Sequence, residues 1–138
     1  MRGPAFAVQQ EFLEALLDLA EAERKPVVFH CVRAAEELMA AMKRHPGIRG
    51  LYHGFRGKPE LLEKLRHAGF YLSLGPAFLN NAALCDYLKT AGLERIGFET
   101  DDSPEPLGLL LGRAAARLGM SPEALEEQTD RTFDAFLG

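Results

Sequence analysis

Short apolar segments alternate with longer helix-like segments along the chain, and this alternation restricts the possible folds more than any other feature. Each short segment is rich in β-branched or aromatic residues and is too short for a helix to be the better interpretation. Each is therefore predicted to be a buried strand. The four predicted strands are PVVFHC (26–31), IRGLYHGF (48–55), FYLSLG (70–75) and RIGFETD (95–101).

Amphipathic segments lie before, between and after these strands. The first repeats apolar side chains at a helical period and carries its acidic side chains on the other face. Proline at the start and glycine at the end mark the helix 59–69, and Ser121 before a proline is a typical N-cap. The predicted helices are 6–23, 34–45, 59–69, 80–92, 106–118 and 122–136.

The regular alternation of strands and helices is typical of βα units. Apolar strands separated by helices favour a parallel sheet that is covered on both faces, so the predicted fold class is α/β. The chain has 138 residues, and 47% of them are apolar, which can support the core of one ordinary domain. We find no linker, repeat or low-complexity segment, and we predict a single domain over residues 1–138.

Composition excludes several classes of protein. The net charge of -4 is not that of a globally basic nucleic-acid binder, although residues 24–67 hold ten Lys or Arg against four acids. Two cysteines are too few for a disulfide scaffold, and no secretory signal pattern opens the chain. No apolar run approaches the roughly 18 residues of a membrane-spanning helix. We therefore expect a soluble, cytoplasmic protein without a membrane partner.

Polar side chains follow the predicted strands at their carboxyl ends. These residues are His30, His53, Ser73 and Asp101, the last followed by Asp102. Ligands of parallel α/β proteins bind beyond the carboxyl ends of the strands, where the loops converge. Imidazole and carboxylate groups bind metal ions and move protons. The pattern predicts that these side chains share one site.

Other polar residues have simpler interpretations. A single histidine at a strand end is usually a surface or hydrogen-bonded residue, so the prediction depends on the recurrence of such residues. His45 and His67 are expected to be solvated, while Cys31 and Cys85 are expected to be small buried hydrophobic residues.

The segment HGFRGKPE (53–60) has the composition of an anion-binding loop. Its glycines permit a tight turn, and Arg56 and Lys58 lie just before a predicted helix N-terminus, which favours anions. Arg33 and Ser73 are further candidates for substrate contact. An ordinary loop with solvated cations is an equally good interpretation of this segment.

Four ordered motifs resemble the TatD family of metal-dependent hydrolases, the TatD-type DNases. They are PVVFHC, HGFRG, GFYLS and ETD, and they occur in the order and at the spacing of the family's later strands. The final segment ALEEQTDRTFDAFLG resembles the family's closing helix. The resemblance extends over nearly the whole chain.

This resemblance implies a fold, an activity and a set of site residues. The chain would supply strands five to eight, the second half, of a TIM-type barrel. The family holds two divalent ions and hydrolyses phosphodiester bonds, including DNA in the manner of a 3′–5′ exonuclease. His30 and His53 match ligands of the second ion, and Asp101 matches the catalytic aspartate that binds the first ion and orients the attacking water. Zn, Mn and Mg all remain open.

The family's His-x-His pair and bridging glutamate, on its first and fourth strands, have no counterpart in this sequence. Four parallel strands cannot close a barrel of eight, so we expect exposed strand edges and an open apolar face. Three arrangements follow: a homodimer, docking with an N-terminal half, or a small open sheet. The alternative function is a non-catalytic half-barrel that acts as an interaction or regulatory module. A misplaced start or a fragment of a complete enzyme is a further alternative.

Overall fold

One parallel sheet organises the computed structural model, which describes residues 5–138. Its strands are β1 (Val27–Phe29), β2 (Gly50–Tyr52), β3 (Tyr71–Leu74) and β4 (Ile96–Phe98), and they lie in the order β1-β2-β3-β4. The structure confirms the predicted α/β class with parallel strands. Each strand is shorter than predicted, because residues at both predicted ends lie outside the sheet.

Helices connect and cover the strands. At the start of α4 (Ala82–Ala91), Asn81 Oδ1 accepts the N–H of Leu84 at 3.1 Å. At the start of α6 (Pro122–Leu137), Ser121 Oγ accepts the N–H of Ala124 at 3.1 Å. A 3-10 helix between β3 and α4 was not predicted. No helix in residues 5–138 is both long and apolar enough to cross a membrane. The helices are α1 (Phe6–Ala22), α2 (Ala35–Arg44), α3 (Pro59–His67), η1 (Pro76–Asn80), α4 (Ala82–Ala91), α5 (Leu107–Leu118) and α6 (Pro122–Leu137).

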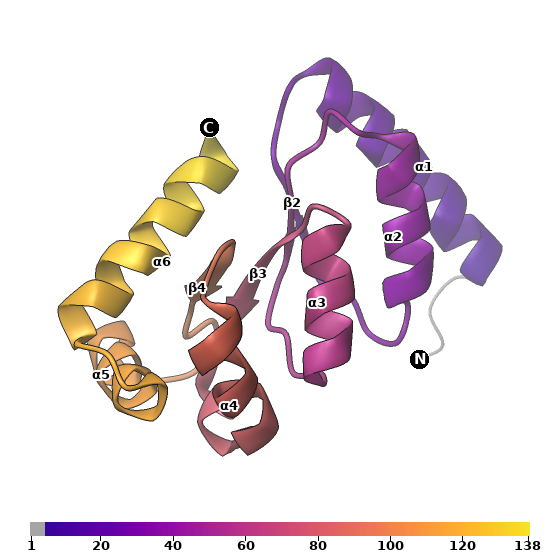
Figure 1. Cartoon of the computed structure of the whole chain (residues 1–138). Coiled ribbons are helices and arrows are strands. Elements are labelled where there is room, and N and C mark those ends of the chain that lie inside the picture. The colour runs from indigo at the N-terminus through magenta and orange to yellow at the C-terminus, as the bar shows by residue number, and fades with distance from the viewer. Residues whose placement is uncertain (1–4) are drawn as a thin grey trace.

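The two faces of the sheet have different covers. Leu72 and Ile96 are fully buried in the main core, which also contains residues of α2 to α5. Helix α6 lies on the other side of the sheet from α2 and α3 (Figure 1). A Cβ on Gly97 would come within 2.9 Å of the Phe133 ring, so this glycine allows α6 to approach β4 closely. The ring of Phe136 contacts that of Tyr71 with centroids 5.7 Å apart.

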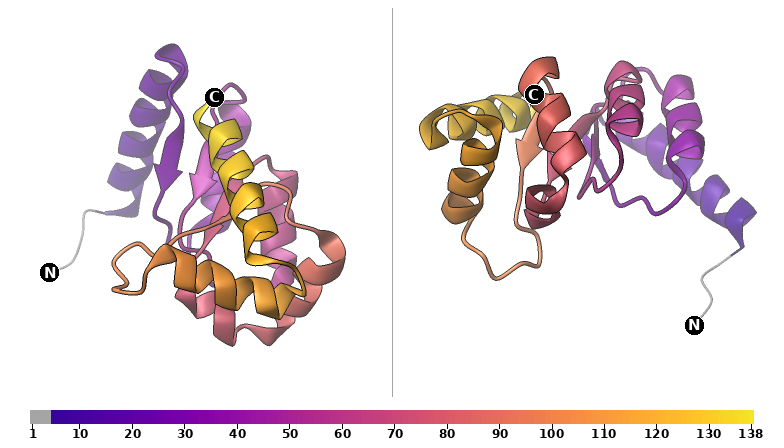
Figure 2. Two further views of the ribbon diagram at one scale, coloured as in Figure 1. Left: turned by 90° about the vertical axis from the view of Figure 1, so that its left-hand side faces the viewer. Right: turned by 60° about the horizontal axis from the view of Figure 1, so that its bottom comes forward.

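The apolar side chains of α1 are mostly exposed. Leu17 is fully buried, but Val8, Phe12, Leu16 and Leu19 are between 48% and 67% exposed. We call these four residues the α1 stripe. Strand β1 is an edge of the sheet, and the views of Figure 2 show α1 at the same end of the molecule. This end of the molecule therefore carries exposed apolar surface on a helix.

Acidic side chains of α1 pair with two basic residues at the end of α2. Glu14 Oε2 lies 2.9 Å from His45 Nε2, and the same carboxylate pairs with Arg44. Asp18 and Glu21 lie 3.6 Å and 3.4 Å from His45 Nδ1. We call His45 and these three carboxylates the α1 clasp. The prediction that His45 is solvated is wrong, because the residue is only 5% exposed.

The α1 clasp changes the acid–base properties of its members. The hydrogen bond from Glu14 outweighs burial and raises the pKa of His45 above its ordinary value. Hydrogen bonds from Arg44 and His45 lower the pKa of Glu14 to about 2. The clasp therefore favours a charged imidazole between ionised carboxylates.

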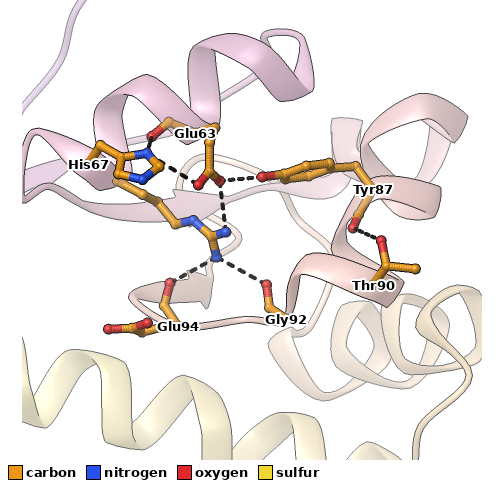
Figure 3. A network of polar contacts seen from close by, with 7 residues as sticks. Glu63, His67, Tyr87, Thr90, Gly92 and Glu94 are labelled. Atoms are coloured by element: carbon orange, nitrogen blue, oxygen red, sulfur yellow. Dashed lines mark hydrogen bonds and ion pairs between the residues drawn. The ribbon is translucent and has the colours of Figure 1, made fainter.

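A second polar network joins α3 to α4 and to the loop before β4 (Figure 3). The Tyr87 hydroxyl donates to Glu63, and Arg66 pairs with the same carboxylate at 2.8 Å. Arg66 also donates to the carbonyls of Gly92 and Glu94 at 3.1 Å and 3.5 Å. The hydrogen bond with Tyr87 is the main cause of the lowered pKa of Glu63. His67 stays exposed at the edge of this network, as predicted.

Candidate functional site

A cavity of about 610 Å³ lies at the carboxyl ends of the strands. The loops after all four strands contribute to its wall, as the parallel topology requires. The cavity brings together residues that are far apart in the sequence. Its lining includes His30, Cys31, Arg33, His53, Arg56, Glu99, Asp101 and Asp102.

His53 is held between two carboxylates on the loop that follows β4. Its Nδ1 lies 2.7 Å from Glu99 Oε2, and its Nε2 lies 3.2 Å from Asp101 Oδ2. The backbone N–H of His53 donates to the Phe29 carbonyl at 3.0 Å, which extends the pairing of β1 and β2 beyond the strands. The imidazole is 18% exposed, so it is largely enclosed while one edge still reaches the cavity.

The surroundings of His53 act on its pKa in opposite directions. Burial favours the neutral imidazole and lowers the pKa, while the hydrogen bonds and negative charges of Glu99 and Asp101 raise it. The carboxylates together outweigh burial, so the pKa of His53 lies above its ordinary value. Burial is the main cause that raises the pKa of the nearby Tyr52 to about 12. The Tyr52 hydroxyl donates to the Cys31 carbonyl at 3.2 Å.

Ser73 forms a hydrogen bond with the carboxylate of Glu99. The Ser73 hydroxyl donates to Glu99 Oε2 at 2.7 Å and accepts the backbone N–H of Gly54 at 3.2 Å. Ser73 is fully buried and does not line the cavity. The structure therefore contradicts the predicted substrate contact by Ser73, because its hydroxyl is enclosed and already bonded to protein groups.

His30 and Asp101 approach His53 from opposite edges of the sheet. The rings of His30 and His53 have centroids 6.0 Å apart. Asp101 has a positive φ of 45°, and the cavity residue Arg33 has a φ of 58°. Non-glycine residues with such values are uncommon and recur at functional sites. Strained turns after β4 and β1 thus place the side chains of Asp101 and Arg33 on this rim.

The donor atoms at this rim have the chemistry of a divalent-metal site. Imidazole nitrogen and carboxylate oxygen suit Zn and Mn, and carboxylate oxygen suits Mg. Carboxylates that hydrogen-bond a ligating histidine are also typical of metal sites. Among residues 5–138, however, no three His, Cys, Asp or Glu side chains are gathered closely enough to form a metal-binding group. His30, His53 and Asp101 thus fit the chemistry of such a site as a partial set of ligands.

The remaining sequence candidates fall into two groups. Arg33 and Arg56 line the cavity, whereas Lys58 precedes α3 and is not part of its wall. Cys85 is buried as expected, while Cys31 is half-buried and faces the cavity. Glu99 is the site residue that sequence reasoning missed. Its position two residues before Asp101, at the end of a predicted strand, is the signal that could have identified it.

Comparisons with known proteins identify the family of this chain. The family described as TatD related DNase matches residues 2–137. The uncharacterized metal-dependent hydrolase YjjV of Escherichia coli (strain K12) is 30% identical over 113 residues, covering 80% of this chain and 44% of that protein. The uncharacterized metal-dependent hydrolase BU355 of Buchnera aphidicola subsp. Acyrthosiphon pisum (strain APS) is 29% identical over 106 residues, covering 72% and 40%.

A solved structure gives the same result for the fold. A hydrolase TatD family protein from Entamoeba histolytica superposes with a TM-score of 0.80 at 14% identity, over 99% of this chain and 59% of that chain. The chain spans about two fifths of the length of the two curated relatives. Because the family match covers nearly the whole sequence, the chain belongs to the TatD related DNase family.

Proposed function

We propose that this chain carries part of the active site of a metal-dependent hydrolase that cleaves phosphodiester bonds. DNA ends are the proposed substrate, and 3′–5′ exonucleolytic removal of nucleotides is the proposed reaction. The observation that supports this most is the position of His53 between Glu99 and Asp101, at the rim of the cavity that His30 also lines. Family membership supports the reaction class.

His30, His53 and Asp101 are the residues that would hold divalent ions. A bound ion lowers the pKa of water and stabilises negative charge on phosphodiester oxygens. The half-buried imidazole of His53 supplies a nitrogen ligand that is already oriented. Asp101 is 60% exposed, so its carboxylate can accept a hydrogen bond from the attacking water and orient it.

Two cations in the cavity wall would bind the substrate. Arg33 and Arg56 lie on the loops after β1 and β2, and both line the cavity with His53. A guanidinium group matches the geometry of a phosphate and retains its charge at neutral pH. We assign both residues to phosphate binding, which would place the scissile bond above the histidines.

A complete barrel would hold further ligands and strands, which would add to the activity that the residues of this chain support. We propose that β1 and the α1 stripe pack against an N-terminal half-barrel that supplies them. β1 has no strand partner on its outer side among the described residues, and Val28 on this strand is 58% exposed. The relatives' greater length supports the same arrangement. Self-association through the same surface is the competing arrangement.

A nuclease assay tests the proposal. The 138-residue protein is incubated with Mn²⁺ and with DNA that is labelled at its 5′ end, so that removal of 3′ nucleotides gives a ladder. Asp101→Asn should lower the rate by about 10² to 10⁴, as expected for loss of a proton-accepting group. Asp102→Asn is the matched control and should retain most of the rate. Equal rates for wild type and Asp101→Asn would exclude this site as the source of activity.

A non-catalytic interaction module is the second candidate function. The absence of a gathered three-ligand group in residues 5–138 and the exposure of the α1 stripe both favour it. Under this alternative the assay shows no turnover with the wild-type chain, and the chain binds a partner through the α1 stripe. Turnover that depends on Asp101 would contradict it.

A further inference from the structure

We propose that Glu99, held by Ser73, is a positioning residue that keeps the proton of neutral His53 on Nδ1 and leaves Nε2 free in the cavity. The functional meaning of this inference rests on the proposed metal site. The position of the proton is a property of the chain itself, so it can be tested separately.

The direction of the hydrogen-bond chain is set by a backbone amide. The N–H of Gly54 can only donate, and it lies 3.2 Å from Ser73 Oγ. The hydroxyl oxygen therefore accepts this bond and its own hydrogen is available for another partner. Glu99 Oε2, at 2.7 Å, receives that hydrogen.

The same carboxylate oxygen then determines the state of His53. An ionised carboxylate can only accept hydrogen bonds, and Glu99 Oε2 lies 2.7 Å from His53 Nδ1. Nδ1 must carry a proton to complete this contact. Nε2 also faces a carboxylate, that of Asp101 at 3.2 Å, so both nitrogens carry a proton while the imidazole is charged. When the imidazole is neutral, we expect Nδ1 to keep its proton, because its contact with Glu99 is shorter and Glu99 is 18% exposed against 60% for Asp101. Nε2 then holds the free electron pair.

Backbone hydrogen bonds of the sheet hold the residues of this hydrogen-bonded series in place. The N–H of Glu99 donates to the Leu74 carbonyl at 3.0 Å, and the N–H of Phe55 donates to the Ser73 carbonyl at 2.9 Å. Gly54 has a φ of 62°, a left-handed conformation that suits glycine and that turns the chain directly after His53. Ser73 is fully buried, so no solvent exchange competes with its bonds. These backbone hydrogen bonds tie Glu99 and Ser73 to the sheet.

The first test is NMR of the histidine side-chain nitrogens in uniformly ¹⁵N-labelled full-length chain, at a pH where His53 is neutral. Wild type should show His53 in the Nδ1–H tautomer. Glu99→Ala removes the acceptor and should give a mixture of tautomers, whereas Glu99→Gln keeps an acceptor oxygen and should retain the wild-type form to a larger extent. Glu94→Ala removes an exposed carboxylate outside the cavity and should have no effect.

The second test is the affinity for Zn²⁺ or Mn²⁺ measured by titration calorimetry. Glu99→Ala should weaken binding by about 10- to 100-fold, the usual effect of removing a group that orients a ligating histidine. Wild-type His53 with its proton on Nε2 would overturn the proposal, as would a Glu99→Ala variant with wild-type tautomer and affinity. A wild-type chain that shows the Nδ1–H tautomer but binds neither ion supports the positioning role and overturns the metal site.

Discussion

His53 Nε2 lies 3.2 Å from Asp101 Oδ2, although the two residues are separated by 48 positions in the sequence. The contact joins the loops that follow β2 and β4, which are not neighbours in the sheet. The loops span the intervening strand because Glu99 and Ser73 bridge the space between them. This relationship is the centre of the proposed site.

Loss of the α1 clasp is expected to change how stability depends on pH. Because the pKa of His45 is raised in the folded protein, its charged form stabilises the fold fully below the ordinary pKa of 6.5. This contribution is lost as the pH rises through the pKa that His45 has in the folded protein. Urea unfolding should therefore show wild type losing stability relative to His45→Gln as the pH rises above 6.5.

The carboxylates of the clasp set its acidic limit. The pKa of Glu14 is lowered from 4.5 to about 2, so its contribution is present above pH 4.5 and is lost as the pH falls through about 2. Relative to Glu14→Gln, wild type should lose stability over that acidic range. Parallel pH profiles for wild type and His45→Gln would contradict the assignment of the clasp.

Tyr87→Phe is expected to weaken the link between α3 and α4. The substitution removes the hydroxyl that donates to Glu63 and leaves the ring in place. We expect the free energy of unfolding to fall by about 1 kcal/mol, the usual value for one hydrogen bond. Thr90→Ala, which removes an exposed hydroxyl bonded to the Tyr87 carbonyl, should change it by less than about 0.5 kcal/mol. Equal effects of the two substitutions would show that the Tyr87 hydroxyl does not stabilise this interface.

Gly97→Ala is expected to disturb the contact between β4 and α6. The added methyl group would lie 2.9 Å from the Phe133 ring, closer than carbon atoms can pack. We expect a loss of about 1 to 3 kcal/mol, as for other overpacked cores. The double variant Gly97→Ala/Phe133→Leu should recover part of this loss, because the smaller side chain makes room. Chemical denaturation measures both, and failure of the double variant to recover would argue against this contact.

Charge in the α1 stripe is expected to change association and to leave the fold intact. Phe12 and Leu16 are 67% and 48% exposed, so Phe12→Glu/Leu16→Glu removes little buried area. If the α1 stripe binds a second copy of the chain, sedimentation velocity should show a dimer for wild type and a monomer for the double variant. Ala7→Glu, an exposed position of α1 outside the stripe, should not have this effect. A wild-type monomer at all accessible concentrations would exclude self-association and favour a different partner.

The sequence was sufficient to predict the parallel α/β class and the loops that converge on one cavity. Alternating apolar segments specify strands, and parallel strands place their carboxyl ends on one edge. This explains why His30, His53 and Asp101 could be expected to lie near one another. The metal-binding roles of these residues stay predictions.

Side-chain direction and burial were the parts that the sequence did not determine. The period of α1 shows which residues share a face but not which face is covered, so the buried carboxylate contacts of His45 were missed. Glu99 follows β4 directly, and only the pairing of β3 with β4 places it beside Ser73. A serine that pattern analysis assigned to substrate is instead a buried support for Glu99.

The most direct test of the proposed site is the metal affinity of the 138-residue protein, measured for wild type and His53→Ala with Zn²⁺ and Mn²⁺. His67→Ala is the matched control, because that imidazole is 76% exposed and lies outside the cavity. The structure predicts that His53→Ala weakens binding by at least about tenfold while His67→Ala binds as wild type does. Equal affinity of all three proteins would contradict the metal site.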